Sequence, residues 1–81
     1  MIRFRLKQLV ADKEFQEDRR VTLEEIARAT GIHRTTLSKI ANIKGYNTTT
    51  DNLDKLCEYF GCELGDLAEF VSMSESKPRD G

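Results

Sequence analysis

The chain has 81 residues, of which 38% are hydrophobic, enough for one small domain with a single modest core. Its formal net charge of −1 hides an asymmetry, because residues 1–49 carry ten Lys or Arg against six Asp or Glu, whereas residues 50–81 carry three against eight. No run approaches the roughly 20 apolar residues of a membrane span, and the start of the chain has no signal-peptide pattern, so we expect a cytoplasmic protein.

The chain begins with a predicted helix at about residues 2–13. Its apolar residues recur at helical spacing, as Ile2, Leu6, Leu9 and Val10. Residues 14–21, EFQEDRRV, are charged and lack apolar periodicity, so we expect a long loop there. Its two arginines, Arg19 and Arg20, either contact phosphate or balance the neighbouring carboxylates.

The next segment predicts two helices joined by a tight turn. The first starts at Thr22, which has the spacing of a capping box with Glu25. Ala27 is small enough for a close helix crossing, and Gly31 supplies a positive-φ corner that a side chain would oppose. A second helix, at about residues 33–42, follows with the apolar set Ile32, Leu37 and Ile40. This spacing is what a helix-turn-helix requires.

The C-terminal half predicts two more helices, at about residues 50–60 and 64–71, after a loop of sequence IKGYNT. Thr49 is expected to cap the first of these helices and Gly61 to end it. Their apolar sets are Leu53, Leu56, Cys57 and Phe60, then Leu64, Leu67, Phe70 and Val71.

These elements together predict a compact all-α domain of five helices. No segment alternates as a strand would, and we expect Leu37 and Leu56 to be buried because each is the centre of an i, i+3 or i, i+4 apolar set. The domain is expected to cover residues 1–71, followed by a disordered polar tail at residues 72–81.

The helix-turn-helix segment also stands out by its charge. Residues 26–50 contain no Asp or Glu. The same window holds five basic or titratable nitrogen side chains, Arg28, His33, Arg34, Lys39 and Lys44. A helix pair without anions favours contact with phosphate, even though the chain as a whole is slightly acidic.

The pattern resembles the Xre-type, lambda repressor and Cro-like helix-turn-helix family, in particular its small single-domain members. The matching positions are Thr22, Ile26, Ala27, Gly31–Ile32 and Thr36-Leu37-Ser38-Lys39-Ile40, and residues 53–67, LDKLCEYFGCELGDL, look like the family's fourth and fifth helices. The resemblance implies a lambda-repressor-like DNA-binding domain, with the helix-turn-helix at helices two and three. It also implies sequence-specific binding of double-stranded DNA, with the helix at 33–42 in the major groove.

Carried over position by position, the resemblance assigns base reading to His33, Arg34, Thr35, Ser38 and Lys39. A helical wheel gives nearly the same set, because these residues do not face the core. Phosphate contacts are expected from Thr22, Asn42, Lys44, Tyr46, Asn47 and Thr48. Three features depart from the family. Leu23 stands where many relatives have a Gln that bonds phosphate, and the connection at residues 14–21 is longer than the tight family turn. His33 occupies a cap position that Ser, Thr, Asp or Asn fills better.

The two cysteines and the single histidine do not indicate a catalytic or metal site. Zinc needs four ligands, and Cys57 and Cys62 have no further Cys beside them. We interpret both as core residues, with a redox pair as the alternative. No catalytic residue, metal, cofactor or small-molecule ligand is expected.

The function expected from these features is that of a transcriptional regulator, specifically a repressor that binds a two-fold operator as a homodimer. One alternative is a protein-interaction module of the antitoxin or anti-regulator type, in which the helix-turn-helix is a scaffold and the acidic C-terminal half is the binding face. An enzyme or metalloprotein is the second alternative, and metal in stoichiometric amount in the purified protein would favour it.

Overall fold

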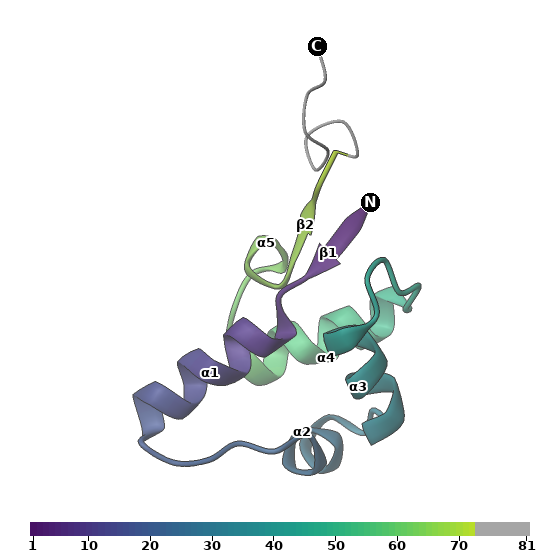
Figure 1. Cartoon of the computed structure of the whole chain (residues 1–81). Coiled ribbons are helices and arrows are strands. Elements are labelled where there is room, and N and C mark those ends of the chain that lie inside the picture. Colours follow the sequence, from purple (N-terminus) through teal and green to yellow (C-terminus); the bar gives the residue numbers. More distant parts are fainter. Residues whose placement is uncertain (73–81) are drawn as a thin grey trace.

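The structure, a computed structural model, describes residues 1–72. Within these residues, helices surround one core, and the two ends of the segment pair as a ribbon that extends away from the helices (Figure 1). The elements in chain order are β1 (Ile2–Phe4), α1 (Leu6–Glu17), α2 (Leu23–Thr30), α3 (Arg34–Asn42), α4 (Thr50–Phe60), α5 (Leu64–Leu67) and β2 (Ala68–Phe70).

The N-terminal segment corrects the prediction of a helix at residues 2–13. Helix α1 begins only at Leu6, and it continues through the expected loop to Glu17. The end of α1 lacks apolar periodicity because it lies at the surface, where Phe15 is 87% exposed. An ion pair between Lys13 Nζ and Glu17 Oε2, 2.8 Å apart and one helical turn along the chain, supports this last turn. Asp18 then ends the helix in the left-handed conformation.

Strands β1 and β2 correct the prediction that the chain has no strand. They pair antiparallel, with Ile2 opposite Phe70, Arg3 opposite Glu69 and Phe4 opposite Ala68. The ladder continues at its end, where Met1 and Val71 exchange backbone hydrogen bonds of 3.0 and 2.8 Å. Helix α5 therefore stops at Leu67 instead of residue 71. The fold remains mostly helical and keeps the predicted class.

The central helices follow the prediction closely. The Thr22 Oγ1 accepts a hydrogen bond of 3.1 Å from the Glu25 N–H at the start of α2, and Thr49 caps α4 in the same way. Gly31 and Gly61 end α2 and α4 with φ of 79° and 63°. The expected polar tail lies outside the described residues, apart from Ser72.

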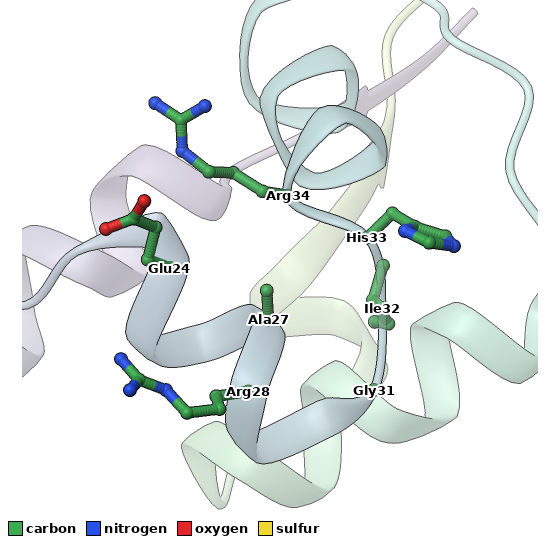
Figure 2. Close-up of a pocket in the computed structure, with 7 residues that line it drawn as sticks. All are labelled: Glu24, Ala27, Arg28, Gly31, Ile32, His33 and Arg34. Carbon is green, nitrogen blue, oxygen red and sulfur yellow. The ribbon is translucent and has the colours of Figure 1, made fainter.

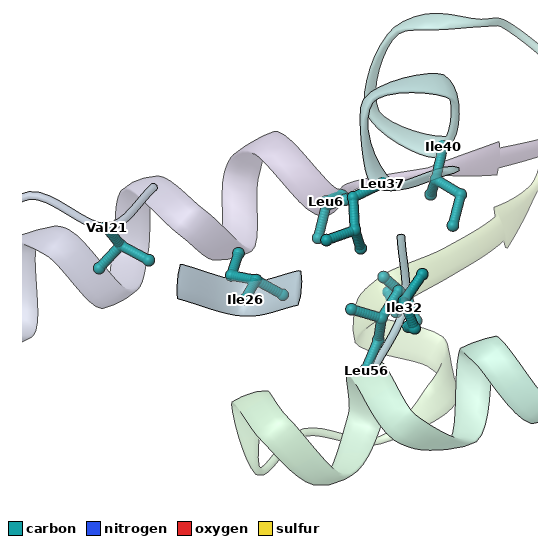
Figure 3. Close-up of a cluster of buried hydrophobic side chains, with 8 residues drawn as sticks. Leu6, Val21, Ile26, Ile32, Leu37, Ile40 and Leu56 are labelled. Atoms are coloured by element: carbon teal, nitrogen blue, oxygen red, sulfur yellow. The ribbon is translucent and has the colours of Figure 1, made fainter. Parts of the chain in front are cut away.

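The core draws on α1 to α5 and on the connections around α2 (Figure 3). Its buried members are Leu6, Val21, Ile26, Ile32, Leu37, Ile40, Leu56 and Leu67. Leu37 and Leu56 are fully buried, which confirms the prediction that both are buried. Burial of each such side chain contributes about 1.5–3 kcal/mol. The inner side of α3 is therefore anchored, and this fixes the direction of its outer side.

Candidate nucleic-acid interface

The corner between α2 and α3 depends on the backbone conformation of Gly31. Its N–H donates to the Ala27 carbonyl at 2.8 Å, and its φ of 79° lies in the left-handed region. A β carbon built on Gly31 would meet no atom within 4 Å, so the requirement for glycine is conformational and not steric. The Thr30 Oγ1 donates to the Ile26 carbonyl and accepts from the Ile32 N–H, which bridges the turn.

Helix α3 separates cleanly into a buried and an exposed side. Leu37 and Ile40 are buried in the core. The predicted base-reading residues lie on the other side: His33, Arg34, Thr35 and Lys39 are exposed, and Ser38 is half-buried. His33 occupies the N-cap position, but its side chain makes no capping hydrogen bond. Its imidazole is therefore not committed to the helix terminus.

Ser38 and Asn42 are linked within α3. The Asn42 Nδ2 donates to the Ser38 carbonyl at 2.9 Å and to the Ser38 Oγ at 3.3 Å. A serine hydroxyl has one donor and two acceptor positions, so the Ser38 O–H remains able to donate. The link also holds the Asn42 amide against the helix, at the end of the exposed side.

The predicted phosphate-binding residues differ in what the structure does with them. Lys44 and Asn47 are exposed in the loop after α3. In the same loop, Tyr46 is half-buried and packs against the core, and the Thr48 Oγ1 accepts from the Asn52 Nδ2 at 3.0 Å. Thr22 is exposed, with its hydroxyl oxygen used as the cap of α2. Lys44 and Asn47 are thus the loop side chains most open to an external anion.

An open cleft of about 590 Å³ lies where α2 meets the start of α3 (Figure 2). It is lined by Glu24, Ala27, Arg28, Gly31, Ile32, His33 and Arg34. Glu24, Arg28 and Arg34 extend toward the same side of Figure 2. Among the ion pairs of residues 1–72, none joins Glu24 to either arginine.

Glu24 is a residue that the sequence analysis missed. Residues 26–50 contain no Asp or Glu, but this window begins after Glu25 and so excludes Glu24. The crossing of the two helices places Glu24 in one cleft with Arg34. The signal that could have found it is the helix-turn-helix itself, because its short turn sets the second helix across the first and so brings together side chains that are far apart in the sequence.

The connection between α1 and α2 is held by a network of charged side chains. Arg19 binds Glu25 through Nη1–Oε1 at 2.9 Å and Nη2–Oε2 at 2.7 Å, and its Nε binds the Glu17 Oε1 at 2.8 Å. The Glu14 carboxylate accepts from the Val21 N–H at 2.9 Å. Of the two roles considered for Arg19, charge balance is the one that this geometry shows.

These contacts shift the ionisation of the network. The hydrogen bond from Arg19 lowers the pKa of Glu25, and hydrogen bonds from Lys13 and Arg19 lower the pKa of Glu17. Hydrogen bonds to Glu25 and Glu17 raise the pKa of Arg19 in turn. The start of α2, which forms one wall of the cleft, is therefore tied to the end of α1 by ionised groups at neutral pH.

A family model described as a Cro/C1-type HTH DNA-binding domain matches residues 5–72. The chain belongs to this family. The match covers β2 and all the helices, and it confirms the resemblance and the fold class predicted from the sequence. Neither the curated proteins nor the solved structures gave a match.

Membership of the Cro/C1-type family makes the chain a DNA-binding regulator. The helix-turn-helix of this family corresponds to α2, the Gly31 corner and α3 in the present chain. Within residues 1–72, no helix is long and apolar enough to cross a membrane. The same residues contain no group of three or more His, Cys, Asp or Glu side chains that could hold a metal ion.

Proposed function

We propose that the protein is a transcriptional repressor that recognises a specific operator as a homodimer and reads the major groove with α3. The observation that carries this proposal is the two-sided character of α3. Its inner residues, Leu37 and Ile40, are buried, so the helix is rigidly backed by the core. Its outer side presents hydrogen-bonding and cationic groups at His33, Arg34, Thr35 and Lys39. A rigid polar helix face of this kind is suited to base edges.

Each outer residue of α3 has a chemistry that suits base reading. The Arg34 guanidinium can donate two hydrogen bonds to guanine O6 and N7, and the Thr35 methyl can contact a thymine methyl. His33 and Lys39 add donors at either end of the exposed side, and Ser38 can still donate its hydroxyl hydrogen. Arg34 is the residue to which we assign the strongest discrimination between bases.

Backbone anchoring is proposed for residues at the edges of this face. Lys44 and Asn47 extend from the loop after α3, Asn42 lies at the end of α3, and Tyr46 and Thr48 support the loop from inside. Thr22 and the free N–H groups at the start of α2 suit a second phosphate. Glu24 lies beside this helix start and opposes close approach of an anion there, so we place the main anchor in the loop at Lys44.

The proposed homodimer uses the β1–β2 ribbon. Phe70 is 72% exposed and Ile2, opposite it in the ladder, is 46% exposed. A paired apolar surface at a ribbon that extends away from the helices is costly to leave in water, and a second copy would cover it. A two-fold dimer presents two copies of α3, which fits a two-fold operator with half-sites about 34 Å apart.

We propose repression as the mode of regulation. A compact protein that occupies an operator blocks the same DNA to other proteins, and this mode of action needs no enzymatic activity. A cytoplasmic location is part of the same proposal.

Selection of bound duplexes from a random DNA pool tests the proposed function. We expect an enriched motif with two-fold symmetry and half-sites about one helical turn apart. A selection that enriches no sequence, at a salt concentration where the protein remains folded, would contradict the proposal. That outcome would favour the interaction module, with the acidic C-terminal half as its binding face.

A further inference from the structure

The end of α4 places the two cysteines of the chain at the paired positions of one backbone motif. Gly61 has a left-handed φ of 63°. The Cys62 N–H donates to the Cys57 carbonyl at 3.0 Å, and the Gly61 N–H donates to the Glu58 carbonyl at 3.3 Å. This pair of bonds defines a Schellman motif, in which the side chains that correspond to Cys57 and Cys62 commonly touch.

The backbone hydrogen bond limits the separation of the two cysteines. Each Cα lies within about 2.4 Å of its own carbonyl oxygen and about 1.5 Å of its own nitrogen. The 3.0 Å bond therefore holds the Cα atoms of Cys57 and Cys62 to within about 7 Å of each other. Disulfides join Cα atoms that are about 4.4–6.8 Å apart, so the backbone keeps this pair close to bridging distance without a rearrangement.

The side chains share one environment. Both cysteines are free thiols, both are half-buried, and both pack against the hydrophobic core. Burial, followed by the neighbouring Cys57 thiol, raises the pKa of Cys62. Cys62 also lines an open cleft of about 370 Å³ between α1 and the segment around α5, whereas Cys57 is not among the lining residues of that cleft. The two thiols are thus adjacent, but only Cys62 faces the cleft.

We propose that Cys57 and Cys62 form an oxidation site that takes a hydroperoxide and closes to an intrachain disulfide. The Cys62 sulfur attacks one oxygen of the peroxide, the O–O bond breaks, and Cys62 becomes a sulfenic acid while the peroxide is reduced to an alcohol, or to water for hydrogen peroxide. The Cys57 thiol then attacks the Cys62 sulfur and releases water. The two sulfurs together lose two electrons and two protons, which reduce the peroxide.

The disulfide ties the last turn of α4 to the segment that leads into α5 and β2. The raised pKa of Cys62 keeps the thiol protonated at neutral pH, so we expect a slower reaction than that of a low-pKa cysteine. The product closes a short loop around Gly61 and restricts the unfolded chain. Among the residues of the chain, the reaction requires only the two thiols, so the proposal stands independently of the proposed DNA function.

Treatment of the full-length protein with hydrogen peroxide tests this proposal. We expect the intact mass to fall by two hydrogen atoms and both thiols to become resistant to alkylation, with full reversal by dithiothreitol. Thermal unfolding of the oxidised protein should move upward by several degrees relative to the reduced protein. Peptide mapping should place the bond between Cys57 and Cys62 in one chain.

Two single variants serve as matched controls. Cys57→Ser removes the second thiol, so Cys62 should stop at a sulfenic acid that a dimedone probe traps. Cys62→Ser removes the thiol that faces the cleft, so labelling by the same probe should be much slower. The proposal is overturned if the wild-type protein keeps both thiols, gains oxygen atoms without closing a disulfide, or forms its disulfide only between two chains.

Discussion

Arg19 binds Glu25 through two parallel hydrogen bonds, of 2.9 and 2.7 Å, and so joins the segment after α1 to the first turn of α2. Glu25 is also the residue whose N–H is capped by Thr22. The backbone N–H of Glu25 binds Thr22 and its carboxylate binds Arg19, so both groups hold the start of α2 in place. The start of α2 borders the cleft that is lined by Arg34, so the Arg19–Glu25 ion pair positions one wall of the proposed DNA-binding face.

Arg19→Ala should reduce the dependence of stability on pH between neutral and acidic conditions. Because Arg19 lowers the pKa values of Glu25 and Glu17, their contribution is present above the ordinary glutamate pKa and is lost as the pH falls through the lowered values. We expect a small loss of stability at neutral pH and low salt, and a smaller one at high salt because the pair is exposed. Thermal unfolding from pH 7 down to about pH 3 should show a shallower acid decline in the variant than in the wild type. Parallel profiles for the two proteins would contradict this assignment.

Leu37→Ala and Leu56→Ala should each cost about 2–5 kcal/mol of unfolding free energy. Both side chains are fully buried, and each substitution leaves a cavity among the other core residues. Urea unfolding monitored by circular dichroism would measure the loss. Phe15→Ala, at an 87% exposed position, is the control and should change the stability little. A core variant as stable as this control would show that the core is wrongly placed.

Phe70→Glu should give a folded monomer with much weaker operator binding. The substitution puts a charge on the exposed apolar pair of Phe70 and Ile2, and the carboxylate would have to be desolvated in a ribbon-to-ribbon contact. Phe15→Glu introduces the same charge at a more exposed phenylalanine on α1 and should leave the association unchanged. Sedimentation at several concentrations would compare the three proteins. The proposal that the β1–β2 ribbon forms the dimer interface would be contradicted if the wild type is monomeric at every concentration, or if only Phe15→Glu dissociates the dimer.

Lys44→Ala should weaken binding to all DNA sequences alike. Lys44 is exposed in the loop after α3, where it can contact the DNA phosphate backbone but lies outside the helix to which we assign base reading. Loss of one phosphate contact should reduce the slope of log affinity against log salt by about one unit. Glu24→Gln changes the net charge by one unit in the opposite direction and should strengthen binding to all sequences, because it removes an anion from the cleft. If the slope of log affinity against log salt is unchanged in Lys44→Ala, Lys44 does not contact a phosphate.

The sequence predicted α2 and α4 well because each has strong local signals at both ends, and α3 well because its apolar residues recur at helical spacing. Thr22 and Thr49 cap two of them, and Gly31 and Gly61 end the same two. The errors lie at the two ends of the domain and at the end of α1, which continues to Glu17 through part of the expected loop. Three-residue strands are too short to show alternation, and the pairing of Ile2 with Phe70 joins residues at opposite ends of the described chain. Ile2 also happened to lie at helical spacing from Leu6, which extended the predicted helix in the wrong direction.

The candidate site was predicted in part for similar reasons. Helical periodicity was enough to place Arg34, Thr35 and Lys39 on the exposed side of α3. It could not show that Glu24 shares a cleft with Arg34, or that Arg19 binds Glu25, because both relationships depend on how separate segments are brought together. Side-chain use within the loop, such as the bond from Asn52 to Thr48, was equally invisible.

The most direct test of the central claim is the ratio of affinities for the selected operator and for a scrambled duplex of equal length, measured at one fixed salt concentration. For the wild type we predict a ratio of at least about 10³. Arg34→Ala should reduce the affinity for the operator by about 1–3 kcal/mol and relax the preference at one base position, with little change in binding to the scrambled duplex. Equal affinity of the wild type for the two duplexes would contradict sequence-specific reading by α3.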